Sequence, residues 1–263
     1  MFAWRVFAQE PGAGPGAYLT VPELARRGVN VAFTSRQGGR SAPPYASLNL
    51  SYTSGDDPET VRANRARALA AVGGGLESWT GGRQVHGTRT ERVGAEHRGA
   101  GWDSPARVVP DTDALWTDAA DLSLVVLTAD CTPIVLVDLA ARRVGVAHAG
   151  WRGLTSGVVE ATVAAMGRGG SLRAFVGPSI GPCCYEVGDD VSGLARDRLG
   201  DVVRVVGGKQ HLDLWAGTLV ALRRAGVRDV WPAALCTKCE PGRFYSHRAG
   251  DTGRQAALVR LAA

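Results

Sequence analysis

Four short apolar runs constrain the fold of this chain more than any other feature. They cover residues 122–128, 134–137, 144–147 and 174–176, and polar or turn-forming residues bound each run. Apolar runs of about four to eight residues are typical of strands buried in a sheet. No stretch reaches the roughly 18 consecutive apolar residues that a membrane-spanning helix needs. We therefore expect the chain to fold around a buried sheet, without a membrane as partner.

Helical patterns accompany these runs. Two of them, residues 58–72 and residues 213–225, begin beside an Asp that can cap the helix and end at glycine. A third pattern follows Arg152, with Thr155 or Ser156 as the expected cap. Because helices and strands do not alternate strictly, the pattern predicts an α+β fold.

Composition indicates a globular protein of one domain. The 263 residues are 45% hydrophobic, which supplies a sizeable core, and no linker separates two halves, so we expect a single domain over residues 1–263. The 30 Lys and Arg residues exceed the 25 Asp and Glu residues, but no basic run stands out, which favours small anions over nucleic acid as partners. The segment MFAWRVFAQEPGAGPG lacks a signal-peptide pattern, and five unevenly spaced cysteines do not form a disulfide framework. A cytoplasmic protein with reduced thiols is expected.

Two of the apolar runs predict a hairpin that gathers reactive side chains. If residues 134–137 pair with residues 144–147, facing residues have numbers that sum to about 280. The numbers of Cys131 and His148 sum to 279, so these side chains are expected side by side at the open end, within a register slip of a residue or two. Asp130 precedes Cys131. A thiol, an imidazole and a carboxylate are therefore expected where strands end and loops begin, a common location for chemistry.

A thiolate beside a neutral imidazole supports two chemistries. Cys131 and His148 can form a nucleophile with its base, or they can both bind zinc together with a third ligand. His86, in the Gly-flanked stretch GGRQVHGT, can provide that ligand. Two His and one Cys leave the fourth zinc position open, which is typical of catalytic zinc. For His97 and His211, a surface or packing role is favoured.

Two arginines adjoin glycines in a way that favours anion binding. They are Arg152 in HAGWRG and Arg36 in TSRQGGRS. Glycines let backbone N–H groups approach an anion closely. Arg152 also precedes the expected helix, whose positive N-terminal end adds to the attraction. The pattern predicts a phosphate or carboxylate site, whereas Arg40 and Arg83 are interpreted as solvated loop residues.

The remaining four cysteines form two close pairs, Cys183 with Cys184 and Cys236 with Cys239. A single CxxC indicates a zinc ribbon or a redox site only when further context supports it, and no second CxxC follows here. The two pairs cannot share one metal unless the fold brings them together. We therefore interpret these four as packing or incidental thiols.

Nine motifs, read in chain order, give the sequence a resemblance to a known family. They are SRQGGRS, YASLNL, GDDPETVRANR, QVHG, DTDALWTD, LTADCTP, HAGWRGL, GPSIGPCCYEVG and FYSHR…TGR. The chain resembles, from about residue 30 to about residue 255, the YfiH or laccase-domain family, first described as polyphenol oxidases and later as purine nucleoside phosphorylases. Nine motifs in the family's order make the resemblance specific.

The resemblance implies a fold, a metal and an activity. The implied fold is a single-domain, layered α/β/β/α arrangement with mixed sheets, related to the deamidase domain of cytotoxic necrotizing factors. The implied cofactor is zinc, bound by His86, Cys131 and His148. The implied activities are phosphorolysis of adenosine, inosine, guanosine and methylthioadenosine, together with adenosine deamination. His247 in FYSHR departs from the pattern of many members, so no role is carried over to it.

The expected site residues and partners follow. The side chains expected to bind nucleoside and phosphate are Arg36, Arg152, Asn49 and Gln84. Catalytic roles are expected for Cys131, His148, His86, Arg152 and Asp130. Asp130 or Asp113 is expected either to carry protons or to support a ligand His. The expected partners are purine nucleosides and phosphate, and the protein is expected to be a monomer or a homodimer.

The polyphenol oxidase description is at odds with the histidine content. A multicopper oxidase needs on the order of ten His ligands, several in His-x-His pairs. The chain has five His and no His-x-His. Three alternatives to the phosphorylase stay open: a polyphenol oxidase with copper bound in vitro at the His–Cys–His site, a metal-free cysteine hydrolase or deamidase using Cys131 and His148, and a nucleotide or metal sensor without activity.

Overall fold

The computed structural model describes residues 1–167 and 172–262. Two six-stranded sheets form its centre. The first contains, in spatial order, β1 (Ala3–Val6), β2 (Ala17–Thr20), β3 (Val29–Thr34), β14 (Gln255–Leu261), β7 (Ser123–Thr128) and β4 (Trp79–Gly81). The second contains β13 (Asp229–Pro232), β10 (Leu172–Val176), β8 (Thr132–Asp138), β9 (Arg143–Ala149), β6 (Ala114–Thr117) and β5 (Thr90–Arg92). Both sheets are mixed, because β4–β7, β5–β6 and β10–β13 pair in parallel and the other neighbours antiparallel.

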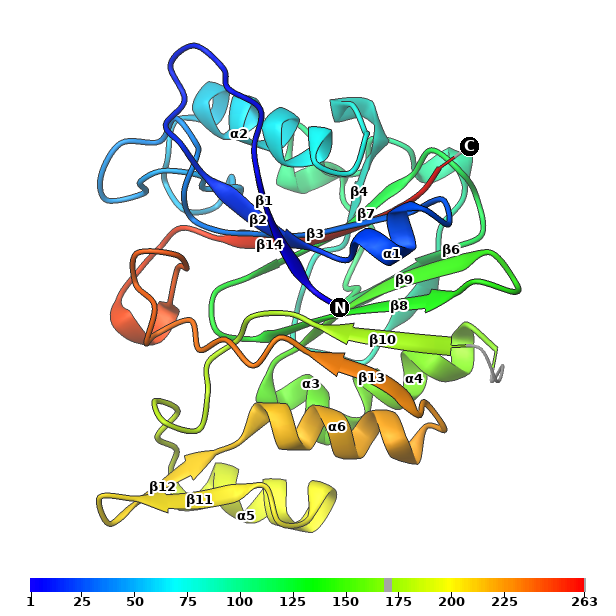
Figure 1. The fold of residues 1–263 in the computed structure, drawn as a ribbon. Coiled ribbons are helices and arrows are strands. Elements are labelled where there is room, and N and C mark those ends of the chain that lie inside the picture. Colours follow the sequence, from blue (N-terminus) through cyan, green and yellow to red (C-terminus); the bar gives the residue numbers. More distant parts are fainter. Residues whose placement is uncertain (168–171, 263) are drawn as a thin grey trace.

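Helices cover the outer faces of the two sheets (Figure 1). The helices are α1 (Pro22–Ala25), α2 (Pro58–Ala70), α3 (Trp151–Ser156), α4 (Val158–Ala165), α5 (Asp189–Leu199) and α6 (Leu214–Arg224). Helix α2 lies on the first sheet, α3, α4 and α6 lie on the second, and α5 lies farther out beside a hairpin of β11 (Val203–Val206) and β12 (Lys209–Leu212). The expected α+β class and α/β/β/α layering are confirmed.

Alternating side chains along the strands explain why the layers stack. On β8, Val135 and Val137 belong to the core between the two sheets, whereas Ile134 and Leu136 belong to the core under α3, α4 and α6. A strand buried on both faces reads as a continuous apolar run. The four apolar runs of the sequence are accordingly found as β7, β8, β9 and β10.

Two expected helices are confirmed and the start of a third was wrong. Asp57 and Asp213 cap α2 and α6 by accepting hydrogen bonds from backbone amides. The helix expected to start at Thr155 or Ser156 begins instead at Trp151, and Gly157, with φ 98°, separates it from the next helix. Glycine adopts this left-handed conformation without a side-chain clash, so it ends α3 and starts α4. Arg152 therefore lies in the first turn of α3 and does not precede it.

The hairpin of β8 and β9 has nearly the predicted register. Thr132 faces Ala149 and Pro133 faces His148. Cys131 lies one residue beyond the paired part of β8, so it is two positions away from the residue that faces His148. This offset falls within the predicted slip. In the described ranges, no helix is long and apolar enough to cross a membrane.

Candidate metal centre and active-site cavity

Three of the expected residues converge at the open end of this hairpin. The potential ligand atoms of His86, Cys131 and His148 all lie within 4.8 Å of one another. The distance from Cys131 Sγ to His86 Nε2 is 3.7 Å, and the two imidazole ring centroids are 4.8 Å apart. One thiolate and two imidazoles are donors that zinc prefers, and their convergence fits a single ion.

Gly150, the N-cap of α3, makes room for this convergence. A Cβ atom at this position would lie 2.8 Å from Cδ2 of His86 and 2.9 Å from Sγ of Cys131. Real Cβ contacts are longer than this, so any larger residue would push two of the three donors aside. Gly150 thus leaves the space that the ligand side chains need, and it is also the N-cap of α3.

Asp113, just before β6, supports both histidines. Its Oδ1 lies 2.8 Å from Nδ1 of His148, which leaves Nε2 of that ring as the atom available to a metal. The same carboxylate accepts hydrogen bonds from the backbone amides of Val85, His86 and Gly87. These bonds hold His86 at φ 60°, a left-handed conformation that a non-glycine residue rarely adopts. Asp113 therefore occupies the place expected of a carboxylate that supports a ligand His.

Cys131 and His148 titrate as a pair. Burial raises the pKa of the Cys131 thiol, but the positive charge of His148 and hydrogen bonds from His148 and His86 outweigh burial and lower this pKa to about 6. Burial lowers the pKa of His148, but the thiolate and the carboxylate of Asp113 raise it to about 9. Cys131 is therefore a thiolate at neutral pH, which is the form that binds metals and attacks electrophiles.

The cluster lies at a cavity of about 670 Å³. This volume is in the range of small-molecule sites, roughly 300–1,000 Å³. The charged residues that line the cavity are five arginines and one aspartate, namely Arg65, Arg83, Arg152, Arg248, Arg254 and Asp130. Four aromatic residues also line it: Tyr52, Trp79, Trp151 and Tyr185. An excess of arginine beside apolar rings suits a ligand that is both flat and anionic, or a flat ligand together with an anion.

Arg152 and Gln84, which were expected to bind substrate, both line this cavity. Only one of the two side chains is available to a ligand. The Arg152 guanidinium lies over the Trp151 ring, 4.5 Å from its centroid, and no carboxylate of the described residues forms an ion pair with it. Gln84 uses both ends of its amide on the backbone of Leu127, at 2.7 and 2.8 Å. Arg152 is thus available to an anion, whereas Gln84 ties the loop that carries His86 to β7.

Asp130 also lines the cavity, but its carboxylate is occupied. Oδ1 accepts a hydrogen bond of 2.6 Å from the Thr237 hydroxyl, and Oδ2 accepts one of 2.7 Å from the Arg248 amide. Its backbone oxygen accepts a further bond from the Ile180 amide. Asp130 joins three separate segments directly beside Cys131.

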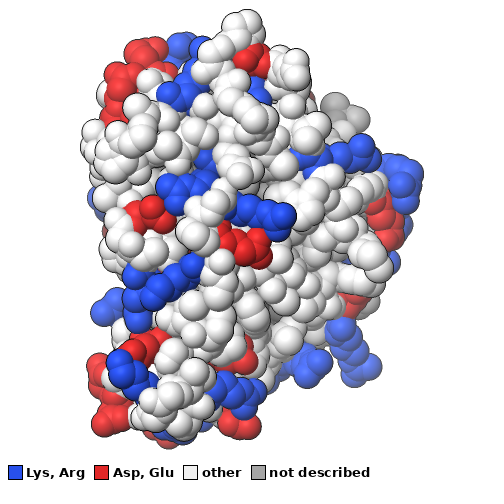
Figure 2. All heavy atoms as spheres, turned by 60° about the vertical axis from the view of Figure 1, so that its left-hand side comes forward, with Lys and Arg blue, Asp and Glu red and all other residues white. Residues whose placement is uncertain are grey.

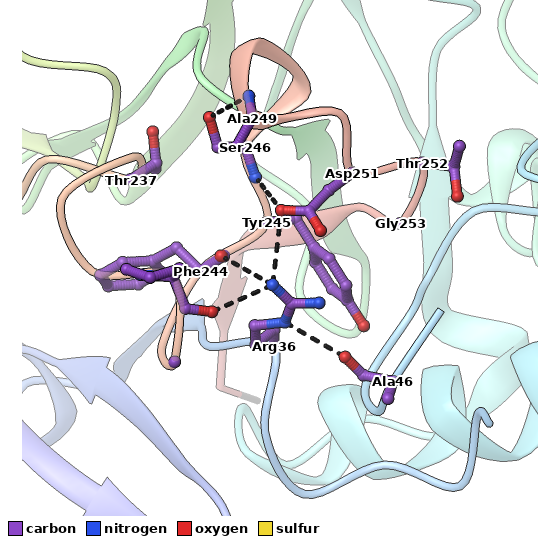
Figure 3. A network of polar contacts seen from close by, with 12 residues as sticks. Arg36, Ala46, Thr237, Phe244, Tyr245, Ser246, Ala249, Asp251, Thr252 and Gly253 are labelled. Atoms are coloured by element: carbon purple, nitrogen blue, oxygen red, sulfur yellow. Dashed lines mark hydrogen bonds and ion pairs between the residues drawn. The ribbon is translucent and has the colours of Figure 1, made fainter. Parts of the chain in front are cut away.

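Arg36 and Asn49 are not among the described residues that line the cavity. Arg36 donates hydrogen bonds to the carbonyl oxygens of Ala46, Pro241 and Phe244 and forms an ion pair of 3.3 Å with Asp251 (Figure 3). The Arg36 guanidinium was expected to bind phosphate, but these contacts within the protein already engage it.

Asn49 is fully buried, and its Oδ1 accepts a hydrogen bond of 3.0 Å from the amide of Arg254. Arg36 and Asn49 therefore hold the segment 244–254, which contributes Arg248 and Arg254 to the cavity.

Replacement of Arg36 tests this structural role. Arg36→Met is expected to lower the free energy of unfolding by about 2–3 kcal/mol, because the carbonyls and Asp251 lose a charged donor. Urea-induced unfolding measures this change. Arg40→Met is the matched control in the same motif. The Arg40 side chain is exposed, and its ion pair with Glu10, at 3.7 Å, is a surface pair that contributes little stability. Equal effects of the two substitutions would show that Arg36 is not a structural anchor.

Sequence reasoning assigned no role to Tyr185, Arg248 and Arg254. The ring of Tyr185 lies under the Arg248 guanidinium, 4.9 Å away, and all three residues line the cavity. Arg248 and Arg254 end the FYSHR and TGR sequences, so the motifs contained a signal for them. His247, to which no role was carried over, also lines the cavity.

The protein surface outside the cavity carries charges of both signs. Figure 2 shows one face on which Lys and Arg side chains lie interspersed with Asp and Glu side chains. Many surface charges are paired, as in Arg92 with Asp118 and Lys209 with Glu186. The excess of arginine in the cavity lining is therefore a local feature.

Comparisons with known proteins agree with the fold. Residues 30–262 match the family model described as multi-copper polyphenol oxidoreductase laccase. The purine nucleoside phosphorylase YlmD of Geobacillus stearothermophilus is 36% identical over 246 residues, which is 88% of this chain and 90% of that protein. A purine nucleoside phosphorylase of Deinococcus radiodurans is 40% identical over 250 residues, 92% of each chain.

Solved structures extend the similarity to the whole fold. The crystal structure of YlmD from Geobacillus stearothermophilus superposes with a TM-score of 0.88 at 35% identity, over 98% of this chain and 99% of that chain. The structure of the Bacillus licheniformis protein YfiH gives a TM-score of 0.87 at 31% identity, over 97% and 98% of the two chains. The match of the family model and the similarity over nearly full length confirm the resemblance of the nine motifs: the chain belongs to the laccase-domain family that includes YfiH and YlmD.

Proposed function

We propose that this protein is a zinc-dependent purine nucleoside phosphorylase that also deaminates adenosine. The observation that carries the proposal is the convergence of His86, Cys131 and His148 at a cavity rich in arginine and aromatic side chains. Relatives at 36% and 40% identity are named purine nucleoside phosphorylases, which supports the same activity here. The proposed substrates are adenosine, inosine, guanosine and methylthioadenosine.

His86, Cys131 and His148 would hold the zinc ion. Zinc bound there would supply a Lewis acid that polarises an oxygen atom of a reactant. Asp113 fixes the orientation of the His148 ring, and Asp130 fixes the loop that carries Cys131. Both carboxylates act as positioning residues, and we propose no proton transfer through Asp130, because both of its oxygens already accept hydrogen bonds.

In phosphorolysis, a phosphate oxygen attacks C1′ of the ribose while the C1′–N9 bond to the purine breaks. The products are the free base, which takes up a proton, and ribose 1-phosphate, or 5-methylthioribose 1-phosphate when methylthioadenosine is the substrate. Positive charge develops on the ribose and negative charge on the purine, so groups that stabilise both accelerate the step. Arg152 and Arg254 are the proposed phosphate ligands, and the aromatic lining of the cavity provides apolar surface for the purine.

In deamination, water replaces phosphate as nucleophile and attacks C6 of adenosine. Ammonia leaves and inosine forms, so the cavity would accept the same nucleoside for both reactions. This activity is proposed for the same residues as phosphorolysis.

Arg152 offers a direct test of phosphate binding. Arg152→Gln is expected to raise the KM for phosphate by about 10–100-fold, because a hydrogen bond to a charged group typically contributes about 1.5–3 kcal/mol. Steady-state kinetics at varied phosphate concentration measures this. Arg142→Gln is the control, since Arg142 is exposed in the turn between β8 and β9 and donates to the carbonyl oxygen of Ala262. An unchanged phosphate KM for Arg152→Gln would remove this residue from the phosphate site.

The function itself is tested by phosphate dependence. Zinc-loaded protein is incubated with each nucleoside, with phosphate or with sulfate at equal ionic strength, and the products are identified by mass spectrometry. We expect free base and the sugar 1-phosphate (5-methylthioribose 1-phosphate from methylthioadenosine) with phosphate only. In sulfate buffer, adenosine should give inosine without free base. Zinc-loaded protein that releases no base from any of the four nucleosides would contradict the phosphorylase and favour a sensor.

A second candidate is a metal-free cysteine hydrolase or deamidase. The observation in its favour is the Cys131 thiolate, whose pKa is about 6, beside His148. Such an enzyme would keep its activity after chelation, whereas the proposed phosphorylase would lose it. Activity on nucleosides and on amide substrates, measured before and after removal of metal, separates the two.

The copper oxidase alternative lacks support from the placement of the histidines. Of the five His residues, which all lie in the described ranges, only His86 and His148 belong to a cluster that can hold a metal. A trinuclear copper centre needs on the order of ten His ligands in all. Copper bound in place of zinc would thus be a single ion.

A further inference from the structure

Four cysteines outside the active-site cavity converge on one point. The Sγ atoms of Cys183, Cys184, Cys236 and Cys239 all lie within 4.8 Å of one another. Sγ of Cys239 is 3.4 Å from Sγ of Cys183 and also 3.4 Å from Sγ of Cys184. The interpretation of these residues as incidental thiols assumed that the two pairs stay apart, and the fold brings them together.

We propose that these four cysteines bind one structural zinc ion, separate from the centre in the cavity. Four Zn–S bonds of about 2.3 Å in a tetrahedron place the sulfur atoms about 3.8 Å apart. Two of the observed S–S distances are 3.4 Å and none exceeds 4.8 Å, which is compatible with this value. Four thiolates complete the coordination of zinc, so the site has no position for a substrate, which is typical of structural zinc.

A backbone amide beside the cluster is placed to stabilise a thiolate. The amide of Gly181 donates a hydrogen bond of 3.2 Å to Sγ of Cys236. A Cβ atom on Gly181 would lie 2.7 Å from the Trp215 ring and 3.3 Å from Sγ of Cys183. Glycine therefore permits the close approach of the loop to the sulfur atoms, and its amide offsets their negative charge.

A disulfide explains the arrangement less well. Bonding needs one pair of sulfur atoms at about 2.05 Å. Cys239 is equally distant from Cys183 and Cys184, so the geometry favours neither pair. A disulfide would also leave two further thiols packed against it without a partner of their own, whereas one zinc ion uses all four.

The zinc would join two segments that hold residues of the cavity wall in place. One segment contains Ile180 and Tyr185, and the other contains Thr237. The amide of Ile180 and the hydroxyl of Thr237 both donate to Asp130, which precedes Cys131. Cross-linking these segments fixes Asp130 from two sides and holds Tyr185 at the cavity. The structural zinc thus stabilises the surroundings of the catalytic centre without touching the substrate.

Metal analysis in a Cys131→Ser background isolates the four-cysteine site. The full chain is produced without added zinc, purified under reducing conditions, and analysed by mass spectrometry for metals. We expect about one zinc per Cys131→Ser chain and almost none after the further substitutions Cys183→Ser and Cys239→Ser. Both residues are exposed, so serine is tolerated sterically. In the otherwise unsubstituted chain, Cys183→Ser with Cys239→Ser should remove zinc from this site only.

Thiol reactivity gives a second measurement, in which all four cysteines of the cluster are kept. In the Cys131→Ser chain, the four thiols should react slowly with a thiol reagent and rapidly after chelation of zinc. Cobalt in place of zinc should give the intense near-ultraviolet absorption of several Co–S bonds. The chain with Cys183→Ser and Cys239→Ser should have a thermal midpoint more than about 5 °C below that of the unsubstituted chain.

Three results would overturn the proposal. The first is a Cys131→Ser chain whose metal content does not change when Cys183 and Cys239 are replaced. The second is rapid reaction of all four thiols in freshly purified protein before chelation. The third is a disulfide between two of these cysteines, found by mass spectrometry after alkylation of the remaining thiols under denaturing conditions. Failure of the phosphorylase assay would leave the four-cysteine site unaffected, because its metal is counted without any substrate.

Discussion

Cys131→Ser is expected to lower kcat/KM for phosphorolysis by more than about 100-fold. Replacing a residue that merely supports a metal ligand typically costs about 10–100-fold in affinity or activity, and Cys131 is itself one of three donors. Serine keeps the size of the side chain but supplies a hydroxyl, which zinc binds far less well than a thiolate. The same substitution should remove about one zinc per chain, so metal content and kcat/KM should fall together.

Two histidine variants serve as comparison for Cys131→Ser. His86→Asn removes a second donor and should reproduce the loss of metal and activity. His97→Asn should retain both, because the partners of His97 Nδ1 are the amide of Gly94 and the exposed carboxylate of Glu96, away from the cavity lining. A Cys131→Ser chain with full zinc occupancy and full turnover would refute the assignment of Cys131 as a ligand. Loss of turnover with zinc retained would instead favour Cys131 as nucleophile.

The hairpin part of the site could be predicted because its register follows from chain order. Two apolar runs with a short turn between them pair antiparallel, so Cys131 and His148 had to lie close together. The layers of the fold were also accessible, since uninterrupted apolar runs indicate strands that are buried on both faces. In each case, the information lies within about 20 residues of sequence, where local geometry limits the alternatives.

The contact of Asp113 with His148 could not be predicted from local sequence patterns. Asp113 precedes β6, which pairs with β9 although the chain runs through β7 and β8 between them. The pairing of Ala114 with Ala147 brings Asp113 beside His148, and no turn in the sequence sets this register. The residues already offered His86 as a third ligand and the family resemblance implied the same residue, but no local pattern placed it beside Cys131.

Local sequence patterns also could not predict which arginines reach the cavity, as the C-terminal strand β14 shows. Strand β14 inserts between β3 and β7 in the middle of the first sheet (Figure 1), so Arg254, directly before it, arrives at the cavity from the far end of the chain. Arg36, two residues before Gly38, matched an anion-binding pattern in sequence, yet its guanidinium anchors the segment that leads to Arg254 (Figure 3). A local pattern identifies a cation but not the residue that it faces, because long-range packing decides which arginine remains unpaired.

Asp113→Asn is expected to weaken zinc binding and phosphorolysis by about 10–100-fold, although Asp113 itself is not a metal donor. The carboxylate is fully buried and accepts hydrogen bonds from His148 and from three backbone amides. An asparagine side chain has one acceptor oxygen, and its NH₂ group must face at least one of these donors. The His148 ring and the loop of His86 would then lose their fixed orientation, and the free energy of unfolding of the metal-free chain should fall by about 3 kcal/mol.

Asp118→Asn is the matched control for this change, because Asp118 follows the same strand but forms an ion pair of 2.8 Å with exposed Arg92. Surface ion pairs contribute about 0–1 kcal/mol, so this variant should keep both its stability and its zinc affinity. Zinc affinity is measured by competition with a chelator and stability by urea-induced unfolding in chelator. If Asp113→Asn destabilises the chain but binds zinc with unchanged affinity, the carboxylate serves only the packing of β6 against β9. If zinc affinity falls while Asp118→Asn is unaffected, the orientation of the histidines by Asp113 is part of the metal centre.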